Sequence, residues 1–277
     1  MGPDSPGGAT GRAGSVHAPR IPGVVGVEVA GFEALLADLG IAVCHEPASE
    51  KMFVLGVRDG ALDLRPPGEA GRPGIRADFP PDRGHRSARR HTSGAANLLV
   101  RAFGRRVDRI FDLTAGLGAD AYRLAGAGYR VQAVERHPAV FALLASGWAR
   151  ACEQGAVPAE VASRLEFVSG EAESALRKLA GADLGVYLDP MYPPPRRRSA
   201  LPKREIQVLR QLVGLQDGVD RLIDLARARA ARVVVKRPHH AEPLASGVSF
   251  ELESKLVRFD VYVNPEKMTG GTETGVP

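Results

Sequence analysis

Two glycines and two carboxylates occur at a spacing that suits nucleotide binding. The segment DLTAGLGAD at residues 112–120 follows a short apolar run, and Glu135 ends the next such run. Gly116 and Gly118 carry no Cβ, so the main chain can turn sharply there and approach a ligand closely. A carboxylate one strand–helix–strand step after such a loop can accept both hydroxyls of an adenosine ribose. These residues therefore indicate a cofactor that contains a nucleoside.

The charges around this loop bear on which cofactor it holds. The pattern Gly116-x-Gly118-x-x-Ala121 also satisfies the GxGxxA fingerprint of NAD(P)- and FAD-binding loops. Asp112 and Asp120 would repel the diphosphate of those cofactors, whereas they suit a ligand that carries an ammonium group. We therefore expect S-adenosylmethionine as the cofactor, with an NAD(P)-dependent oxidoreductase as the alternative.

A second candidate site lies in the segment VYLDPMYP at residues 186–193. In open α/β sheets, ligands bind beyond the carboxyl ends of the strands, so this segment should face the same crevice as the glycine loop. The exocyclic amine of a nucleobase is a weak nucleophile because its lone pair is delocalised into the ring. Asp189 and the Pro190 carbonyl can accept its N–H groups, and Tyr192 can stack on the base. We interpret these three residues as catalytic residues for methylation of such an amine.

Basic residues outnumber acidic ones by 37 to 32, which gives a formal net charge of +5. They gather in two stretches, residues 83–106, which contain no acid, and residues 196–204. Guanidinium groups match phosphate oxygens, and neutralising phosphates releases counterions from nucleic acids. We expect both stretches to flank the crevice, with RNA contacts from Arg86, Arg89, Arg90, Arg197, Arg198, Lys203 and Lys236.

The composition excludes several classes of protein. The hydrophobic content of 44% is too high for a mostly disordered chain, and no apolar stretch approaches the 18 residues of a membrane span. The first twenty residues lack the apolar core of a secretory signal, so we expect a cytoplasmic protein. Cys44 and Cys152 stand apart, and no histidines have metal-binding spacing, so no metal site is expected.

The elements that must position these residues alternate between strands and helices. Short apolar runs predict strands at 109–113, 130–134, 165–168, 185–188, 232–235 and 259–263. Helical spacing falls between them, at 119–127, 138–153, 171–179 and 203–229. This alternation predicts an α/β protein with a mostly parallel sheet covered by helices on both faces, as in Rossmann-like folds.

Shifts in composition predict five regions along the chain. They are a disordered tail at 1–21, a small N-terminal α+β subdomain at 22–82, a basic linker and helix at 83–106, the main α/β domain at 107–263, and a disordered tail at 264–277. Within the subdomain we expect a helix at 32–39 and a hairpin that turns at Arg58-Asp59-Gly60.

With these residues assembled, the chain resembles a bacterial enzyme family, the ribosomal RNA small subunit methyltransferase J family, which methylates N2 of a guanosine in 16S rRNA. The motifs that carry the resemblance are DLTAGLGADAYRLA at 112–125, VERHP at 134–138, VYLDPMYP at 186–193, SALPKRE at 199–205 and VVVKRP at 233–238. Weaker similarity extends over most of residues 30–263.

The resemblance implies a class I S-adenosylmethionine-dependent methyltransferase fold for residues 107–263, with 16S rRNA or the small ribosomal subunit as partner. Carried over by position, it places cofactor contacts just after the glycines of the loop and at the three following strand ends, at Ala119, Asp120, Glu135, Arg136, Glu171, Ala172 and Asp189. The residue types of the loop itself add Asp112, Gly116 and Gly118 to the expected cofactor contacts.

Three other functions remain open from the sequence. The DPMY segment also resembles the DPPY motif of methyltransferases that act on adenine N6, on DNA or on protein glutamine. The GxGxxA pattern leaves the NAD(P)-dependent oxidoreductase. A non-catalytic RNA-binding module would need only the basic stretches. The modified nucleotide and the oligomeric state do not follow from the sequence.

Overall fold

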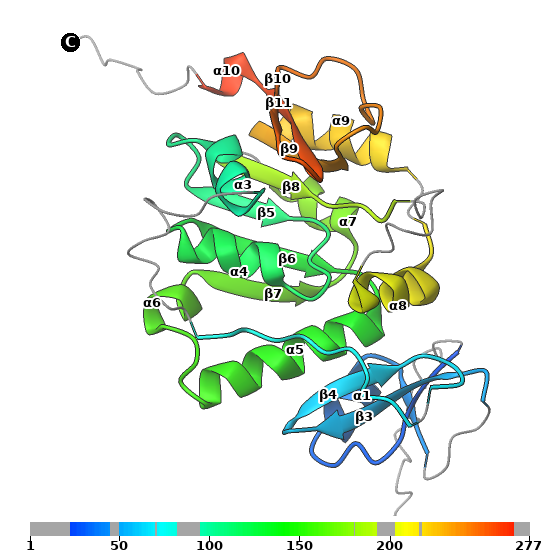
Figure 1. Ribbon diagram of the computed structural model, residues 1–277. Coiled ribbons are helices and arrows are strands. Elements are labelled where there is room, and N and C mark those ends of the chain that lie inside the picture. Colours follow the sequence, from blue (N-terminus) through cyan, green and yellow to red (C-terminus); the bar gives the residue numbers. More distant parts are fainter. Residues whose placement is uncertain are drawn as a thin grey trace, which may run out of the picture.

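The protein is built around a seven-stranded sheet (Figure 1). The computed structural model describes residues 23–44, 50–69, 71–81, 95–179, 181–192, 203–215 and 218–268. The strand order is β10-β11-β9-β8-β5-β6-β7. The bounds are β5 (Arg109–Asp112), β6 (Arg130–Glu135), β7 (Leu165–Ser169), β8 (Gly181–Leu188), β9 (Ala230–Pro238), β10 (Phe250–Glu253) and β11 (Val257–Val263).

Most of this sheet is parallel. The strands β7, β6, β5, β8 and β9 pair in parallel, whereas β11 runs antiparallel to β9 and β10 antiparallel to β11. The two central strands β8 and β9 are buried over most of their length, because helices cover both faces. The mostly parallel α/β sheet predicted from the sequence is therefore confirmed.

Two groups of helices cover the two faces of the sheet (Figure 1). Side chains of α3 and α4 pack with Tyr187 and Val234 on one face, and those of α7 and α9 pack with Val186 and Val233 on the other. The helices are α3 (Ala95–Phe103), α4 (Ala119–Gly126), α5 (Pro138–Glu153), α6 (Ala159–Ala162), α7 (Ala172–Arg177), α8 (Arg204–Val213), α9 (Val219–Arg229) and α10 (Pro265–Met268).

A smaller sheet precedes this main sheet and packs against α5 (Figure 1). Its order is β2-β1-β3-β4, with bounds β1 (Val24–Gly26), β2 (Ala42–Val43), β3 (Phe53–Arg58) and β4 (Ala61–Arg65), and it carries α1 (Glu33–Asp38). The predicted hairpin is present: Asp59 and Gly60 both have positive φ, as a tight two-residue turn between antiparallel strands requires.

The small sheet shares a hydrophobic core with two helices of the main unit, α5 and α8. Val24, Leu55 and Leu64 of the small sheet cluster with Val140 of α5 and Leu209 of α8. A buried hydrogen bond joins the two parts as well, since the Leu62 amide donates to the Ser146 hydroxyl of α5 at 3.2 Å. The smaller sheet therefore helps to hold two helices of the main unit in place.

The structure corrects several predicted elements. The region 203–229 forms two helices, α8 and α9, rather than one, because Gly214 and Gly218 adopt positive φ between them. The sequence did not predict β1, β2, β10 or α6. The tail expected at 264–277 includes the helix α10, while residues 269–277, the tail at 1–21 and the first half of the basic linker and helix, residues 83–94, lie outside the described residues.

Candidate active site

The carboxyl ends of β5, β6 and β8 lie side by side. Asp112 at the end of β5 is level with Ala133 of β6 on one side and with Tyr187 of β8 on the other. Glu135 is the last residue of β6 and Asp189 directly follows the end of β8, so both lie at this edge of the sheet. Because β5 is where the strand order reverses direction, a ligand crevice is expected there.

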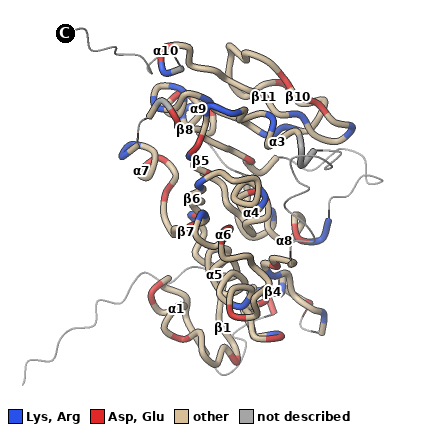
Figure 2. The backbone as a smooth tube through the Cα atoms, turned by 90° about the vertical axis from the view of Figure 1, so that its left-hand side faces the viewer, with Lys and Arg blue, Asp and Glu red and all other residues tan. Residues whose placement is uncertain are grey.

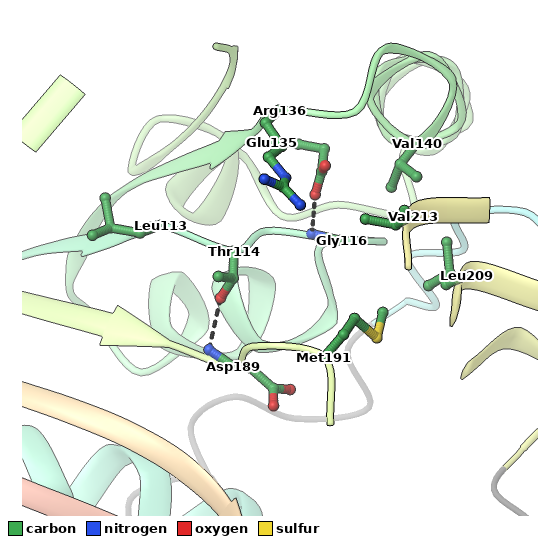
Figure 3. A pocket seen from close by; sticks show the side chains of 10 residues that line it. All are labelled: Leu113, Thr114, Gly116, Glu135, Arg136, Val140, Asp189, Met191, Leu209 and Val213. Carbon is green, nitrogen blue, oxygen red and sulfur yellow. Dashed lines mark hydrogen bonds between the residues drawn. The ribbon is translucent and has the colours of Figure 1, made fainter. Parts of the chain in front are cut away.

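A pocket opens at this edge of the sheet (Figure 3). It is lined by Leu113, Thr114, Gly116, Glu135, Arg136, Val140, Asp189, Met191, Leu209 and Val213. Glu135 and Arg136 lie at one end of it and Asp189 at another, with the apolar side chains between them on one side (Figure 3).

Glu135 is oriented by main-chain amides. Its Oε2 accepts a hydrogen bond from the Gly116 amide at 2.9 Å, and its Oε1 accepts one from the His137 amide at 2.8 Å. Burial raises the pKa of the Glu135 carboxyl, against the lowering effect of these two bonds. A carboxylate can accept about four hydrogen bonds, so acceptor capacity is left for a ligand hydroxyl beside those of the main chain. This geometry fits a ribose.

The two positions of the loop are occupied by glycine for different structural reasons. Gly116 has φ of 54°, and a Cβ there would meet nothing nearer than the Thr114 carbonyl oxygen at 3.9 Å, so it leaves open space at the pocket. Gly118 has φ of 81°, and a Cβ there would lie 2.6 Å from Leu144 and 3.0 Å from Phe167. Gly118 is therefore required by packing of the loop on α5 and β7, not by approach to a ligand.

Asp112 lies beneath the pocket rather than on its wall. It is 1% exposed, and its Oδ1 accepts the Thr114 amide at 2.9 Å. Burial raises the pKa of the Asp112 carboxyl to about 8, and the charges of Asp120, Asp189 and Glu135 add to the rise. The carboxyl is thus mostly protonated at pH 7. The expected direct contact between an ionised Asp112 and a ligand ammonium is not present in this geometry.

Asp189 is held by both its main chain and its side chain. Its amide donates to the Thr114 hydroxyl at 2.7 Å, and its Oδ2 accepts from the Lys236 ammonium at 2.7 Å. About a third of the side chain is exposed, at the pocket. Among the described residues, no protein donor binds its Oδ1, which leaves this oxygen to accept a ligand N–H.

Asp120 points away from the pocket, into a network of buried polar groups. Its Oδ2 accepts from the Lys236 ammonium at 2.9 Å and from the Tyr187 hydroxyl at 2.7 Å, and its Oδ1 pairs with Arg123. Burial acts to raise the pKa of Asp120, but the charges of Lys236 and Arg123 outweigh it, and the net shift is downward. Asp120 is ionised and fully paired in this structure.

Tyr192 is half-buried beside the pocket but does not line it. Its hydroxyl donates to the Lys236 carbonyl oxygen, and the Arg237 guanidinium lies 4.7 Å from the centre of its ring. Burial raises the pKa of the Tyr192 hydroxyl well above its usual value. One face of the ring is thus covered, and a nucleobase would have to stack on the other. Pro190, the remaining predicted catalytic residue, is buried.

The apolar wall of the pocket was not predicted from the sequence. It comes from Val140 on α5, from Met191, and from Leu209 and Val213 on α8 (Figure 3). Helical spacing places Leu209 and Val213 on one face of α8, but only tertiary packing brings that face to the glycine loop. Thr114 was missed as well, although its place between Asp112 and Gly116 marks it as a loop residue at the site.

Six of the predicted cofactor contacts lie outside the pocket lining, among them Asp112 and Gly118, which are described above. Ala119 is exposed in the first turn of α4, and Asp120 is paired as described. Glu171 is exposed before α7, and Ala172 is packed in the core with Leu176. The pocket brings together Gly116, Glu135, Arg136 and Asp189 from the predicted set.

The structure locates only part of the predicted RNA surface. Arg86, Arg89, Arg90, Arg197 and Arg198 lie outside the described residues. Lys203 is exposed just before α8, near the pocket wall. Lys236 is only a quarter exposed, and its charge is matched by two carboxylates rather than free for phosphate.

The end of the first basic stretch does not flank the crevice. Arg105 and Arg106 are exposed just before β5, at the end of the sheet opposite Asp112. Burial lowers the pKa of Arg232 at the start of β9, and the charge of Arg106 lowers it further, which places Arg106 near the amino end of that strand. Figure 2 shows Lys and Arg on the segments around α3 and α9.

The pocket lining fits the nucleoside part of a cofactor. Glu135 offers carboxylate oxygens for ribose hydroxyls, and Val140, Leu209 and Val213 form an apolar wall. Asp112 is mostly protonated, and Asp120 and Asp189 are paired with Lys236, so the choice between the candidate cofactors comes from the comparisons below rather than from the charge of the site. Within the described residues, no three His, Cys, Asp or Glu side chains form a candidate metal site, and no helix is long and apolar enough to span a membrane.

Comparison with known proteins agrees with this geometry. A family model described as putative S-adenosylmethionine-dependent methyltransferase matches residues 37–264. The ribosomal RNA small subunit methyltransferase J of Aliivibrio fischeri is 39% identical over 84% of this chain and 93% of its own length. Its counterpart in Photobacterium profundum is 41% identical over 76% of this chain and 86% of its own.

A solved structure shares the fold over nearly the whole chain. It is an S-adenosylmethionine-dependent methyltransferase of Neisseria gonorrhoeae, 29% identical, with a TM-score of 0.65 over 92% of this chain and 99% of that one. The predicted class I methyltransferase fold and its cofactor, S-adenosylmethionine, are thereby confirmed, in place of the dinucleotide alternative. The resemblance seen in the motifs is confirmed too: the chain belongs to the ribosomal RNA small subunit methyltransferase J family.

Proposed function

We propose that this protein transfers a methyl group from S-adenosylmethionine to the exocyclic N2 amine of a guanosine in 16S rRNA of the small ribosomal subunit. The observation that carries the proposal is the position of Asp189, whose carboxylate faces the cofactor pocket with one oxygen held by Lys236 and the other available. The names of the relatives, small-subunit rRNA methyltransferases, support the substrate class.

The residues of the pocket fit each part of the cofactor. Glu135 would accept the ribose hydroxyls through the lone pairs that the main-chain amides leave free. Val140, Leu209 and Val213 offer an apolar wall for the adenine. When bound, the cofactor supplies an electrophilic methyl group: the amine lone pair forms the new N–C bond, the C–S bond breaks with its electrons left on sulfur, and the nitrogen then releases one proton.

The chain's own residues prepare the amine for this reaction. Asp189 accepts an N–H of the amine, which withdraws the lone pair from the ring and orients it. The proton that the nitrogen releases passes to the same carboxylate or to solvent. Thr114 fixes the main chain of Asp189 through its hydroxyl, so the carboxylate is presented from a rigid turn. The face of the Tyr192 ring opposite the Arg237 guanidinium would be the stacking surface for the base.

The RNA partner is engaged by basic side chains around the pocket. Lys203 at the start of α8 is the described residue best placed for a phosphate contact. We propose the same role for Arg86, Arg89, Arg90, Arg197 and Arg198. An rRNA substrate also implies that the protein acts in the cytoplasm, where small subunits are assembled.

One experiment tests the substrate class against its alternatives. Purified protein is incubated with tritiated S-adenosylmethionine and with small subunits, free 16S rRNA, DNA or protein extract, and the labelled product is digested and identified by mass spectrometry. We expect N2-methylguanosine from rRNA or from small subunits. Label in N6-methyladenine, DNA or glutamine would assign the activity to another amine. RNA binding with strong salt dependence and no methyl product would indicate a binding module.

A further inference from the structure

The Lys236 ammonium is placed between two carboxylates from different elements. Its Nζ lies 2.7 Å from Asp189 Oδ2 and 2.9 Å from Asp120 Oδ2. Lys236 belongs to β9, Asp120 to the first turn of α4, and Asp189 to the turn after β8. The Tyr187 hydroxyl donates at 2.7 Å to the same Asp120 oxygen. One positive charge thus joins three segments that are far apart in the sequence.

We infer that Lys236 is a positioning residue, which holds one oxygen of Asp189 so that the other is presented to the target amine. The inference rests on the proposed function, because it assigns Lys236 a role in that reaction. The first step in its support is geometric: an ammonium at 2.7 Å from Oδ2 fixes the rotation of the carboxylate plane. Asp120 and Tyr187 in turn fix the ammonium, and Thr114 fixes the Asp189 main chain.

The second step concerns the charge on Asp189. Burial and the like charge of Asp120 raise the pKa of its carboxyl above the ordinary value, and the charge of Lys236 opposes this rise. An ionised carboxylate accepts two hydrogen bonds from an amine, whereas a protonated one offers a donor that clashes with it. The ionisable groups coupled to this carboxyl from the surrounding elements are Lys236, Asp120, Asp112, Tyr187 and Tyr192. Lys236 is the cation in direct contact among the described residues.

The third step separates this role from a contact with RNA. A lysine that binds phosphate keeps its charge exposed to solvent, as Lys203 does. Lys236 is a quarter exposed and already has two anionic partners. Its two carboxylates raise the pKa of its ammonium despite the opposing effect of burial, so the charge persists throughout the working pH range. A phosphate brought to this site would be repelled by the same two carboxylates.

The test compares Lys236→Met with Lys236→Arg, which keeps the charge, and with Lys178→Met, which removes an exposed lysine at the end of α7. Methyl transfer is measured from pH 5 to pH 9 under saturating cofactor. Removal of the cation raises the pKa of Asp189, and the reaction needs the ionised form. We therefore expect the acid limb of kcat to move upward by about one to three pH units in Lys236→Met.

At pH 7 we expect kcat of Lys236→Met to fall by about tenfold or more, while KM for RNA stays within about threefold. Lys236→Arg should recover part of kcat and return the acid limb toward its original position. Lys178→Met should match the unchanged protein. An unshifted acid limb in Lys236→Met would overturn the inference. So would a higher KM for RNA at constant kcat, because that result assigns Lys236 to phosphate binding.

A second measurement does not depend on activity. The pKa of the Asp189 carboxyl is followed by NMR in protein with carbon-13-labelled aspartate, assigned with Asp189→Asn. The pKa of Asp189 should be higher in Lys236→Met than in the unchanged protein. The same pKa in both proteins would overturn the inference, even if no substrate were methylated. Lys236→Gln, which keeps a donor without the charge, serves the same comparison if the methionine variant does not fold. If the unchanged protein yields no methyl product while this pKa shift is present, the proposed function fails and the Lys236–Asp189 coupling stands.

Discussion

The Asp189 amide donates a 2.7 Å hydrogen bond to the Thr114 hydroxyl, and this bond joins the turn after β8 to the glycine loop after β5. The Thr114 hydroxyl also lies 3.4 Å from the Asp112 carboxyl. The Thr114 amide donates a hydrogen bond to that carboxyl at 2.9 Å. The cofactor loop and the segment for the target amine are therefore fixed to each other by one side chain.

Thr114→Val tests this junction, because valine keeps the shape of threonine without its hydroxyl. The Asp189 amide then loses its acceptor, and we expect a loss of about 1–3 kcal/mol in the free energy of unfolding. We also expect a fall of about tenfold in kcat, since the Asp189 turn is no longer held. Chemical denaturation and methyl-transfer kinetics measure the two effects. Thr114→Ser retains the hydroxyl and is the matched control; equal losses in both variants would contradict the role of the hydrogen bond.

Asp189→Ala should abolish methyl transfer, with a loss of at least about a hundredfold in kcat. Affinity for S-adenosylhomocysteine, measured by calorimetry, should stay within about tenfold, because Glu135 and the apolar wall are unchanged. Asp189→Asn should lose nearly as much activity as alanine. The Lys236 ammonium will hold the amide oxygen, which turns the NH2 group toward the target amine. Normal turnover by either variant would remove Asp189 from the chemistry.

The two loop glycines should respond differently to alanine. In Gly118→Ala the new Cβ meets Leu144 at 2.6 Å and the left-handed conformation is strained, so we expect a stability loss of about 2–4 kcal/mol. Gly116→Ala has free space for its Cβ and pays only the conformational cost of about 1–2 kcal/mol. Its methyl group enters the pocket lining, so its affinity for S-adenosylhomocysteine should fall. Thermal unfolding and calorimetry on both variants separate the two effects.

Asp112 should make stability fall as the pH rises. Its carboxyl has a pKa of about 8 in the folded protein, against 3.8 as the ordinary value, so the folded state binds a proton that the unfolded state has released between these values. The stabilisation that this group contributes is fully present below its pKa in the unfolded state. As the pH rises toward 8, the free energy of unfolding falls by at most about 1.4 kcal/mol per pH unit. Asp112→Asn imitates the protonated form and should flatten this slope. Denaturant titrations of both proteins between pH 5 and pH 8.5 measure it; parallel curves would contradict the shift.

The parts of the fold that depend on local pattern could be predicted from the sequence. The apolar runs that form β5, β6 and β8 are short and bounded by turn residues, so the strand ends and the residues beyond them follow directly. Because parallel strands end at one edge, Glu135 and Asp189 could be expected to meet at a crevice. The edge strand β10 was missed because its FELE sequence is largely exposed and carries no buried alternation.

The parts that depend on tertiary packing could not be predicted. Nothing near Leu209 or Val213 in the sequence indicates that α8 forms a wall of the pocket. Lys236 and Asp120 are more than a hundred residues apart, and their pairing depends on where β9 and α4 lie relative to β8. Asp120 was therefore expected to face the cofactor and Lys236 to face RNA. The general character of the site was predictable, but the partner of each charged group was not.

The hydrophobic core that the small sheet shares with α5 and α8 affects how the enzyme loses its activity. Leu209 belongs both to that core and to the pocket, and Arg204 ties the start of α8 to Glu69 at 2.5 Å. A fragment beginning at residue 107 would thus keep every strand of the large sheet and still lack a supported adenine wall. Heat inactivation and melting of the small sheet should coincide, because this sheet supports a helix of the pocket rather than forming an independent unit.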